Sequence, residues 1–384
     1  MSKIEEMIKR LCPNGVERVR LDSLLDYEQP TRYIVNSTEY DSKYSIPVLT
    51  AGQSFILGYT NEEDGIYKAS PQNPTIIFDD FTTGFHWVDF DFKVKSSAMK
   101  MLKLKESKKK NDFRYIYMAM KTIDYIPTNH TRHWISIYGK FEIPLPPPTI
   151  QREIVSVLDS FTTLINKMKQ EVELRKKQME YYREKMLLFD EQEADFVKIK
   201  DLFDTKNGYT PSTKNPDYWT DNGIPWVKME DIRENGTVLS DSAKHITMSA
   251  VKGSKLFNAN SIIFATSATI GVHALVTVPH LSNQRFTNIY PKKEYQKKID
   301  MKYAYYYFFK IDRWCKEHVT LGNFAGVNMS DFYDYDFPLP TPSTQRSIVS
   351  TLDAFEQYIS KLERLITLRE KQYAYYREKL LTFE

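Results

Sequence analysis

This sequence contains FEIPLPPPTIQREIVSVLDSFTTLINKMKQEVELRKKQMEYYREKMLLFD at residues 141–190 and repeats it, 194 positions later, as YDFPLPTPSTQRSIVSTLDAFEQYISKLERLITLREKQYAYYREKLLTFE at residues 335–384. The two copies align without a gap, and about half of their fifty positions are identical. The prolines that open each copy cannot lie inside a helix, so we expect an extended lead-in followed by a helix, with Thr149 and Ser343 as candidate caps. A repeat of this length decides the organisation of the chain.

Each copy carries a heptad pattern. Seam residues alternate in steps of four and three for about five heptads, from Ile154 to Phe189 in the first copy and from Ile348 to Phe383 in the second. They are apolar or aromatic except for an arginine at the same seam position in both copies, Arg175 and Arg369. So narrow an apolar seam is typical of a long helix that packs mainly against one other helix, and the obvious partner is the other copy. Helices of about forty residues are about 60 Å long, so we expect them to act as antiparallel spacers.

The segments between the repeats are weakly related to each other. VRLDSLLD, from Val19, resembles VKIKDLFD, from Val197, and both segments are rich in β-branched and aromatic residues with Asn-Gly breaks. The sequence therefore predicts an α+β fold in which two mixed, strand-rich domains are separated by a long antiparallel two-helix coiled coil, with a pseudo-twofold internal repeat. The expected divisions are a first domain with a short N-terminal helix at 1–143, a first spacer helix at 144–190, a second domain at 191–337 and a second spacer helix at 338–384.

Composition restricts the class of protein. Two cysteines in 384 residues cannot form a disulfide framework, and the sequence shows neither a signal peptide nor a membrane-spanning run. We expect a cytoplasmic protein that does not contact a membrane. The net charge of +3 neither requires nor excludes nucleic acid, although KLKESKKKND, residues 103–112, forms one local basic cluster. That cluster is either a solvated loop or a contact for a phosphate backbone.

Two unlike domains, each followed by a long helix with a Pro-Leu-Pro lead-in and a Gln-Arg pair (Gln151-Arg152 and Gln345-Arg346), resemble the specificity subunit of type I restriction-modification systems. NGYTPSTKNPDYW at 207–219 and IPWVKMEDI at 224–232 add to the resemblance, whereas the first domain has YEQPTRY and IPVLTAGQSF instead. The resemblance implies a sequence-specific DNA-binding subunit with two target recognition domains, each reading half of a bipartite, asymmetric site in double-stranded DNA. The helices would dock two methyltransferase subunits and, through them, restriction subunits.

The resemblance also implies that this chain is not an enzyme and binds no cofactor, with S-adenosylmethionine expected in the methyltransferase partner. NPDYW, from Asn215, differs by Asp217 from the tetrapeptide of adenine methyltransferases, and no Gly-rich loop precedes it. Asp80, Asp91 and Lys93 loosely match a nuclease pattern but equally describe a strand. Three alternatives remain open at this stage, namely a diverged single-chain DNA methyltransferase, a nuclease, and a coiled-coil scaffold that does not read DNA.

Candidate DNA-binding residues follow from side-chain chemistry, because Arg, Lys, Asn and Gln can read base edges while Ser, Thr and Tyr can hold phosphates. Each could equally be a turn residue or part of a solvated strand face. The candidates in the first domain are Gln29, Arg32, Tyr33, Gln53, Thr82, Thr83, His86, Lys100, Lys108, Lys109 and Lys110, and those in the second are Lys206, Tyr209, Thr210, Ser212, Lys214, Thr266, Ser267, Thr269, Asn283, Gln284 and Arg285. The candidate partner-binding residues, apolar or aromatic but outside the heptad seam, are Tyr181, Leu187 and Tyr375. We expect no metal ligands.

Overall fold

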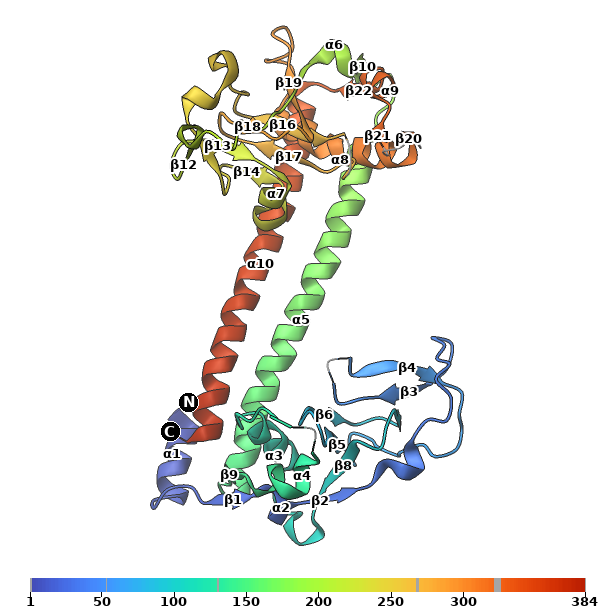
Figure 1. Cartoon of the computed structure of the whole chain (residues 1–384), viewed down its shortest axis with the longest axis vertical. Helices are drawn as coiled ribbons and strands as arrows, with labels where there is room; N and C mark the ends of the chain where they lie inside the picture. The colour runs from blue at the N-terminus through green and yellow to red at the C-terminus, as the bar shows by residue number, and fades with distance from the viewer. Residues whose placement is uncertain (1, 53, 130, 267–268, 321–325, 384) are drawn as a thin grey trace. The chain divides into compact units, whose positions relative to one another are not determined.

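The computed structural model describes residues 2–52, 54–129, 131–266, 269–320 and 326–383, and Figure 1 shows its helices and strands. Contacts divide the chain into two compact units, which we call unit 1 (residues 1–169 and 364–384) and unit 2 (residues 170–363). The division falls inside both long helices, so each unit contains parts of both. Within the described ranges no helix is long and apolar enough to cross a membrane.

Unit 1 is built on two small sheets and a strand pair. The larger sheet has the order β2-β8-β5-β6 and is antiparallel, the smaller has the order β4-β3-β7, and β1 pairs with β9. The elements are α1 Ser2–Leu11, β1 Arg18–Arg20, α2 Leu21–Leu24, β2 Leu25–Glu28, β3 Ile46–Leu49, β4 Ile56–Thr60, β5 Thr75–Asp79, β6 Phe85–Val88, β7 Lys93–Val94, β8 Met99–Leu104, α3 Phe113–Met120, α4 His133–Ser136, β9 Glu142–Pro144 and the start of α5, Pro148–Met186.

Unit 2 repeats this plan. Its larger sheet has the order β11-β19-β16-β17-β14, its smaller sheet β12-β15-β13-β18, and β10 pairs with β22. The elements are β10 Asp195–Lys198, α6 Ile199–Leu202, β11 Phe203–Asn207, β12 Trp219–Thr220, β13 Ile224–Val227, α7 Met229–Asn235, β14 Val238–Leu239, β15 His245–Ile246, β16 Ser261–Ala265, β17 His273–Val276, β18 Leu281–Ser282, β19 Phe286–Pro291, α8 Met301–Glu317, β20 Val319–Thr320, β21 Gly326–Val327, α9 Met329–Tyr333, β22 Asp336–Leu339 and α10 Pro342–Thr382. The order β2-β8-β5-β6 matches β11-β19-β16-β17, and the order β4-β3-β7 matches β15-β13-β18, with β14 and β12 added at the sheet edges of unit 2. This correspondence confirms the predicted internal repeat and the predicted fold class.

The long helices run antiparallel within each unit. In unit 1 the rings of Phe161 and Tyr376 lie 5.6 Å apart and Lys169 pairs with Glu370 at 2.7 Å. In unit 2 the Lys176 ammonium lies 2.9 Å from the Glu363 carboxylate. Lys176 follows Lys169 on α5, whereas Glu363 precedes Glu370 on α10, as antiparallel pairing requires. The seam residues predicted from the heptads are buried near these contacts, among them Ile165, Val172, Ile359 and Ile366.

Helix ends complete both cores. The core of unit 1 combines Leu24 and Ile76 from the globular part with Ile154 from the start of α5 and with Leu380 and Leu381 from the end of α10. The antiparallel pairing is what brings the two helix ends into one core. The expectation that the tail of the second copy docks against the first domain is therefore confirmed.

The core of unit 2 is completed in the same way, by Leu187 after the end of α5 and by Ile348 and Leu352 from the start of α10. The prediction that Leu187 contacts a partner is wrong, because this side chain is 1% exposed. The prediction placed Leu187 outside the apolar seam by continuing the heptad spacing. That spacing no longer describes the side-chain direction after Met186, because α5 ends there.

A buried glutamine joins each long helix to its globular part. The Gln151 amide oxygen accepts a hydrogen bond from the backbone N–H of Asp112 at 2.7 Å, and its nitrogen donates to the Pro146 carbonyl at 2.7 Å. Asp112 in turn caps α3 by accepting from the N–H of Tyr115. One side chain thus connects the lead-in, the long helix and the cap of a core helix.

Gln345 repeats the arrangement in unit 2. Its oxygen accepts from the N–H of Asp300, the cap of α8, at 2.7 Å, and its nitrogen donates to the carbonyls of Pro340 and Lys298, both at 2.8 Å. An amide side chain offers a donor and an acceptor side by side on one planar group, which suits glutamine to both positions.

Replacing Gln151 or Gln345 by alanine should lower the free energy of unfolding by about 1–3 kcal/mol for each, because buried backbone groups lose their partners. Chemical denaturation of the full chain measures the change. The neighbouring Arg152→Ala and Arg346→Ala variants alter exposed side chains and should change it by less than about 0.5 kcal/mol. Equal effects for the glutamine and arginine variants would contradict this role.

Candidate nucleic-acid interface

The topology of unit 2 gathers three chain segments at one edge of its larger sheet. Antiparallel pairing sets Asn207, at the end of β11, opposite Thr287, and Ala265, at the end of β16, opposite Phe286. The end of β11, the end of β16 and the start of β19 therefore lie side by side. We call residues 206–214, 266, 269–272 and 283–285, which lead to or from these strand ends, the unit 2 edge.

Backbone hydrogen bonds fasten two of these segments together. Gly208 donates to the carbonyl of Phe286 at 2.9 Å, and Tyr209 donates to the carbonyl of Ser282 at 2.8 Å. A Cβ atom on Gly208 would lie 2.3 Å from the carbonyl oxygens of both Ser282 and Asn283, so only glycine allows this approach. The hydroxyl of Thr210 then donates to the side-chain oxygen of Gln284 at 2.6 Å.

The predicted residues of the second domain gather at this edge. Lys206, Thr210, Ser212, Lys214, Gln284 and Arg285 are exposed there, and Tyr209, Asn283, Thr266 and Thr269 are half-buried. The Tyr209 hydroxyl accepts from the N–H of Lys252 at 2.7 Å, and the Asn283 side chain accepts from the N–H of Arg285 at 3.0 Å. These half-buried residues therefore shape the edge, while the exposed ones present donors and acceptors to solvent. Ser267 lies outside the described residues.

Unit 1 has a matching edge. Pairing sets Asp79, at the end of β5, opposite Met99, at the start of β8, and sets Phe78 opposite Phe85, at the start of β6. We call residues 29–33, 80–86 and 95–98 the unit 1 edge. It contains the predicted residues Gln29, Arg32, Tyr33, Thr82, Thr83 and His86, of which Gln29, Arg32 and Thr82 are exposed. Gln53 lies outside the described residues.

Glu28 organises the unit 1 edge. One of its oxygens accepts from the Tyr33 hydroxyl at 2.7 Å and lies 3.2 Å from the Arg32 guanidinium. Burial, together with this hydrogen bond, raises the pKa of Tyr33 to about 12, so its hydroxyl remains a donor. The His86 ring nitrogen Nε2 lies 3.1 Å from the Gly52 carbonyl, and the buried Thr83 hydroxyl donates to the carbonyl of Thr82.

The prediction that Lys100 contacts DNA is wrong. Its side chain is 1% exposed, and its ammonium lies 3.1 Å from the Asp80 carboxylate, which is also buried. The ammonium also lies 4.4 Å from the centre of the Tyr27 ring. A buried charge keeps such a partner, because an unpaired one would cost several kcal/mol.

The basic cluster Lys108, Lys109 and Lys110 is not brought to the unit 1 edge. It follows the end of β8, whereas the edge lies at the start of that strand. Lys109 is paired with Glu106 at 2.6 Å. Any contact of these lysines with a phosphate backbone would therefore be separate from the edge.

The residues that loosely matched a nuclease are separately paired. Asp80 binds Lys100, Asp91 lies 2.7 Å from Lys68, and Lys93 lies 2.9 Å from Glu62. Across the part of the chain that the structure describes, no three His, Cys, Asp or Glu residues are placed to hold a metal ion.

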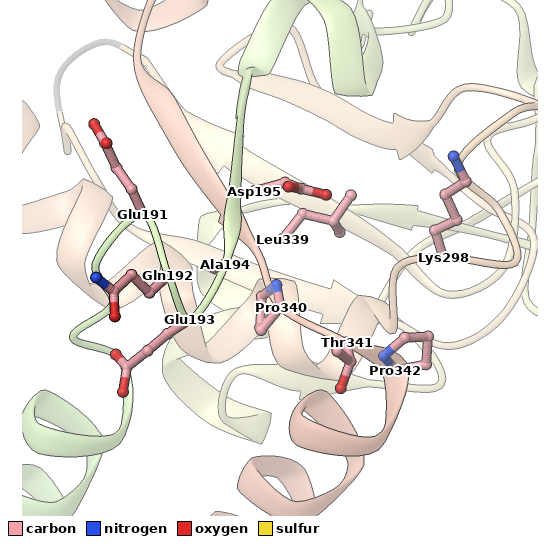
Figure 2. A pocket seen from close by; sticks show the side chains of 10 residues that line it. All are labelled: Glu191, Gln192, Glu193, Ala194, Asp195, Lys298, Leu339, Pro340, Thr341 and Pro342. Atoms are coloured by element: carbon pink, nitrogen blue, oxygen red, sulfur yellow. The ribbon is translucent and has the colours of Figure 1, made fainter.

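A pocket of about 310 Å³ lies in unit 2 between the link after α5 and the lead-in to α10, and Figure 2 shows its lining. Two lining residues, Lys298 and Pro340, are those whose carbonyls accept from Gln345. The charged side chains do not converge, since Glu191 and Glu193 extend in different directions and Lys298 lies apart from both (Figure 2). This pocket therefore offers no assembled set of ligand groups.

The long helices carry exposed apolar stripes. Leu174 and Tyr181, seven residues apart on α5, are each more than half exposed in unit 2, and the repeat-related Leu368 and Tyr375 on α10 are equally exposed in unit 1. Leu188, which follows the end of α5, is also more than half exposed. Tyr181 and Tyr375 are predicted partner contacts, whereas Leu174 and Leu368 were not among the predicted residues. Their seven-residue spacing outside the seam was the available signal.

Comparison with known proteins gives the family. The sequence model of one protein family, described as the type I restriction modification DNA specificity domain, matches residues 13–174 and 191–370, which together make up most of the chain. The chain belongs to this family. The specificity chain is 38% identical over 406 residues to the Escherichia coli type I restriction enzyme EcoR124I/EcoR124II specificity subunit, covering 100% of this chain and 98% of the relative. It is 42% identical over 214 residues to the Escherichia coli EcoprrI specificity subunit, covering 53% of each.

Solved structures share the fold of the specificity chain. The S subunit of a type I restriction-modification system from M. genitalium aligns with a TM-score of 0.56 at 14% identity, over 96% of this chain and 97% of that one. A chain from a study of complex assembly and conformational transition of the type I R-M system aligns with a TM-score of 0.53 at 13% identity, over 94% and 98%. In each unit, the edge is the surface where exposed side chains of the types that can pair with base edges gather at strand ends.

Replacing Gly208 by alanine in the specificity chain should open the unit 2 edge, because the new methyl group would meet two backbone carbonyls. We expect amide exchange at Tyr209, measured by hydrogen–deuterium exchange, to accelerate by about 5- to 150-fold, which corresponds to about 1–3 kcal/mol of local opening. Gly52→Ala is the matched control, since a methyl group there meets its nearest neighbour at an ordinary 3.6 Å. Unchanged protection of Tyr209 would contradict the close approach.

Proposed function

We propose that this specificity chain reads a bipartite, asymmetric site in double-stranded DNA, with the unit 1 edge reading one half and the unit 2 edge the other. The observation that carries the proposal is that two sheets of matching strand order present unlike side chains at the same edge. Unit 1 offers Arg32 held by Glu28, and unit 2 offers Gln284 held by Thr210. Equivalent scaffolds with different donors and acceptors suit two different half-sites.

The proposal includes no catalysis by this chain. Asn215, in the sequence that resembles a methyltransferase tetrapeptide, uses its side-chain oxygen to accept from the N–H of Asp217 at 3.1 Å, so it serves as a turn cap. The methyl donor, S-adenosylmethionine, would be bound by a methyltransferase partner. Cytoplasmic location follows from the proposal, because duplex DNA and this partner would be met there.

The exposed stripes of the long helices are the proposed docking surfaces for two methyltransferase subunits, which would recruit restriction subunits in turn. The support is the equivalence of Tyr181 with Tyr375 and of Leu174 with Leu368, since two identical partners require two similar surfaces. One of the similar structures comes from a study of complex assembly, which agrees with this role.

Exchanging residues 197–336 for the matching segment of another specificity subunit tests half-site reading. In the complex with methyltransferase subunits, methylation-aware sequencing should show one half of the target changed and the other half unchanged, because each edge belongs to a separate unit. Binding to duplex should weaken steeply with salt, since contacts to phosphates release counterions.

The control is the complex assembled with the unexchanged chain. A change in both halves or in neither would refute reading by separate units. A shallow salt dependence without sequence preference would favour a scaffold that does not read DNA. Binding of S-adenosylmethionine by the isolated chain would favour the methyltransferase alternative.

Tyr181→Glu and Tyr375→Glu should each release one methyltransferase subunit, because a carboxylate placed in an apolar interface loses its hydration without gaining a partner. Native mass spectrometry gives the stoichiometry. Tyr181→Phe and Tyr375→Phe keep the apolar ring and should retain both subunits. If both glutamate variants still bind two methyltransferase subunits, these stripes are not the docking surfaces.

A further inference from the structure

The Gln284 side chain is exposed at the turn between β18 and β19, on a backbone held from both sides. Asn283, beside it, donates its N–H to the carbonyl of Val227 at 3.0 Å and accepts at its own carbonyl from Phe286 at 3.2 Å. The segment that carries Thr210 is fixed by the Gly208 and Tyr209 hydrogen bonds. Both partners of the Thr210–Gln284 hydrogen bond therefore start from fixed positions.

That hydrogen bond sets the orientation of the amide. The Thr210 hydroxyl donates to Oε1 of Gln284 at 2.6 Å, which places Oε1 on the side of Thr210 and Nε2 on the other side. An amide oxygen has two lone pairs and Thr210 uses one of them, so Gln284 can still accept through Oε1 while it donates through Nε2. The exposed end of the side chain thus presents an acceptor beside a donor in a defined order.

This pattern complements one base edge. In the major groove adenine offers N7 as an acceptor and its N6 amino group as a donor, whereas guanine offers two acceptors, N7 and O6. Glutamine pairs with adenine through both groups at once, and an amide held in one orientation loses less entropy when it does so.

We propose that Gln284 reads an adenine in the half-site bound by unit 2, and that Thr210 is the positioning residue that holds the Gln284 amide for this contact. The inference rests on the proposed function and assigns a base and two residues within it. The unit 1 edge presents a different group, because the turn before β8 carries Ser96, Ser97 and Ala98 where unit 2 carries Asn283, Gln284 and Arg285.

The test uses the complex with its methyltransferase subunits and a panel of duplexes in which each base pair of the target is changed in turn. Gln284→Ala should lower the preference for adenine at one position of one half-site by about 5- to 150-fold. Thr210→Val keeps the shape of the side chain but removes the donor, and should lower the preference at that same position by about 5- to 20-fold. Thr210→Ser restores the hydroxyl and should restore the preference.

Thr213→Val is the matched control, because Thr213 is an exposed threonine of the same loop, and it should leave every position unchanged. The proposal is overturned if Thr210→Val is silent, if it affects a position other than the one affected by Gln284→Ala, or if that position is not an adenine. Uniform weakening across all duplexes would also overturn it, since that result describes a phosphate contact or a folding defect. Sequence-independent binding by the unmodified complex would instead refute the proposed function itself.

Discussion

The packing of long-helix ends into the globular cores is the contact on which each unit depends. In unit 1, Leu380 and Leu381 from α10 are buried together with Ile154 from α5. Full burial of one such side chain contributes about 1.5–3 kcal/mol, whereas a half-exposed ion pair such as Lys169 with Glu370 contributes about 0–1 kcal/mol. Burial of these apolar side chains therefore supplies most of the stability, and the ion pairs mainly fix which residues of the two helices face each other.

The two copies of the internal repeat share the contacts that join each long helix to its globular part, but they differ in the residues at the unit 1 and unit 2 edges. Gln151 and Gln345 make the same hydrogen bonds to the caps of α3 and α8, and four strands of the larger sheets follow the same order in both units. At the strand ends the chemistry differs, since a carboxylate holds a guanidinium in unit 1 and a hydroxyl holds an amide in unit 2. Edge residues can change without disturbing the cores, because their side chains lie outside the packed interior.

The sequence predicted the repeat, the helices and their antiparallel pairing, because a heptad seam is a local pattern and a long repeat fixes its partner. The edges were predicted only as collections of polar residues near turns, since the hydrogen bond between Thr210 and Gln284 spans 74 positions. Lys100 was misassigned because the apolar and basic run of β8 does not reveal which face is buried, and its partner Asp80 belongs to another segment. Leu187 was misassigned because the end of a helix is less visible in a sequence than its periodicity.

Because residues 364–384 belong to unit 1, the two units can complete their folding in a defined order during translation. Unit 2 is contained in residues 170–363, so it can be complete while the core of unit 1 still waits for Leu380 and Leu381. At about 5–20 residues per second, translation from residue 170 to residue 364 takes about 10–40 s. During that interval the nascent chain carries uncovered apolar surface around Ile4 and Ile154, the kind of surface that chaperones protect. The half of the protein that is translated first is thus the half that is finished last.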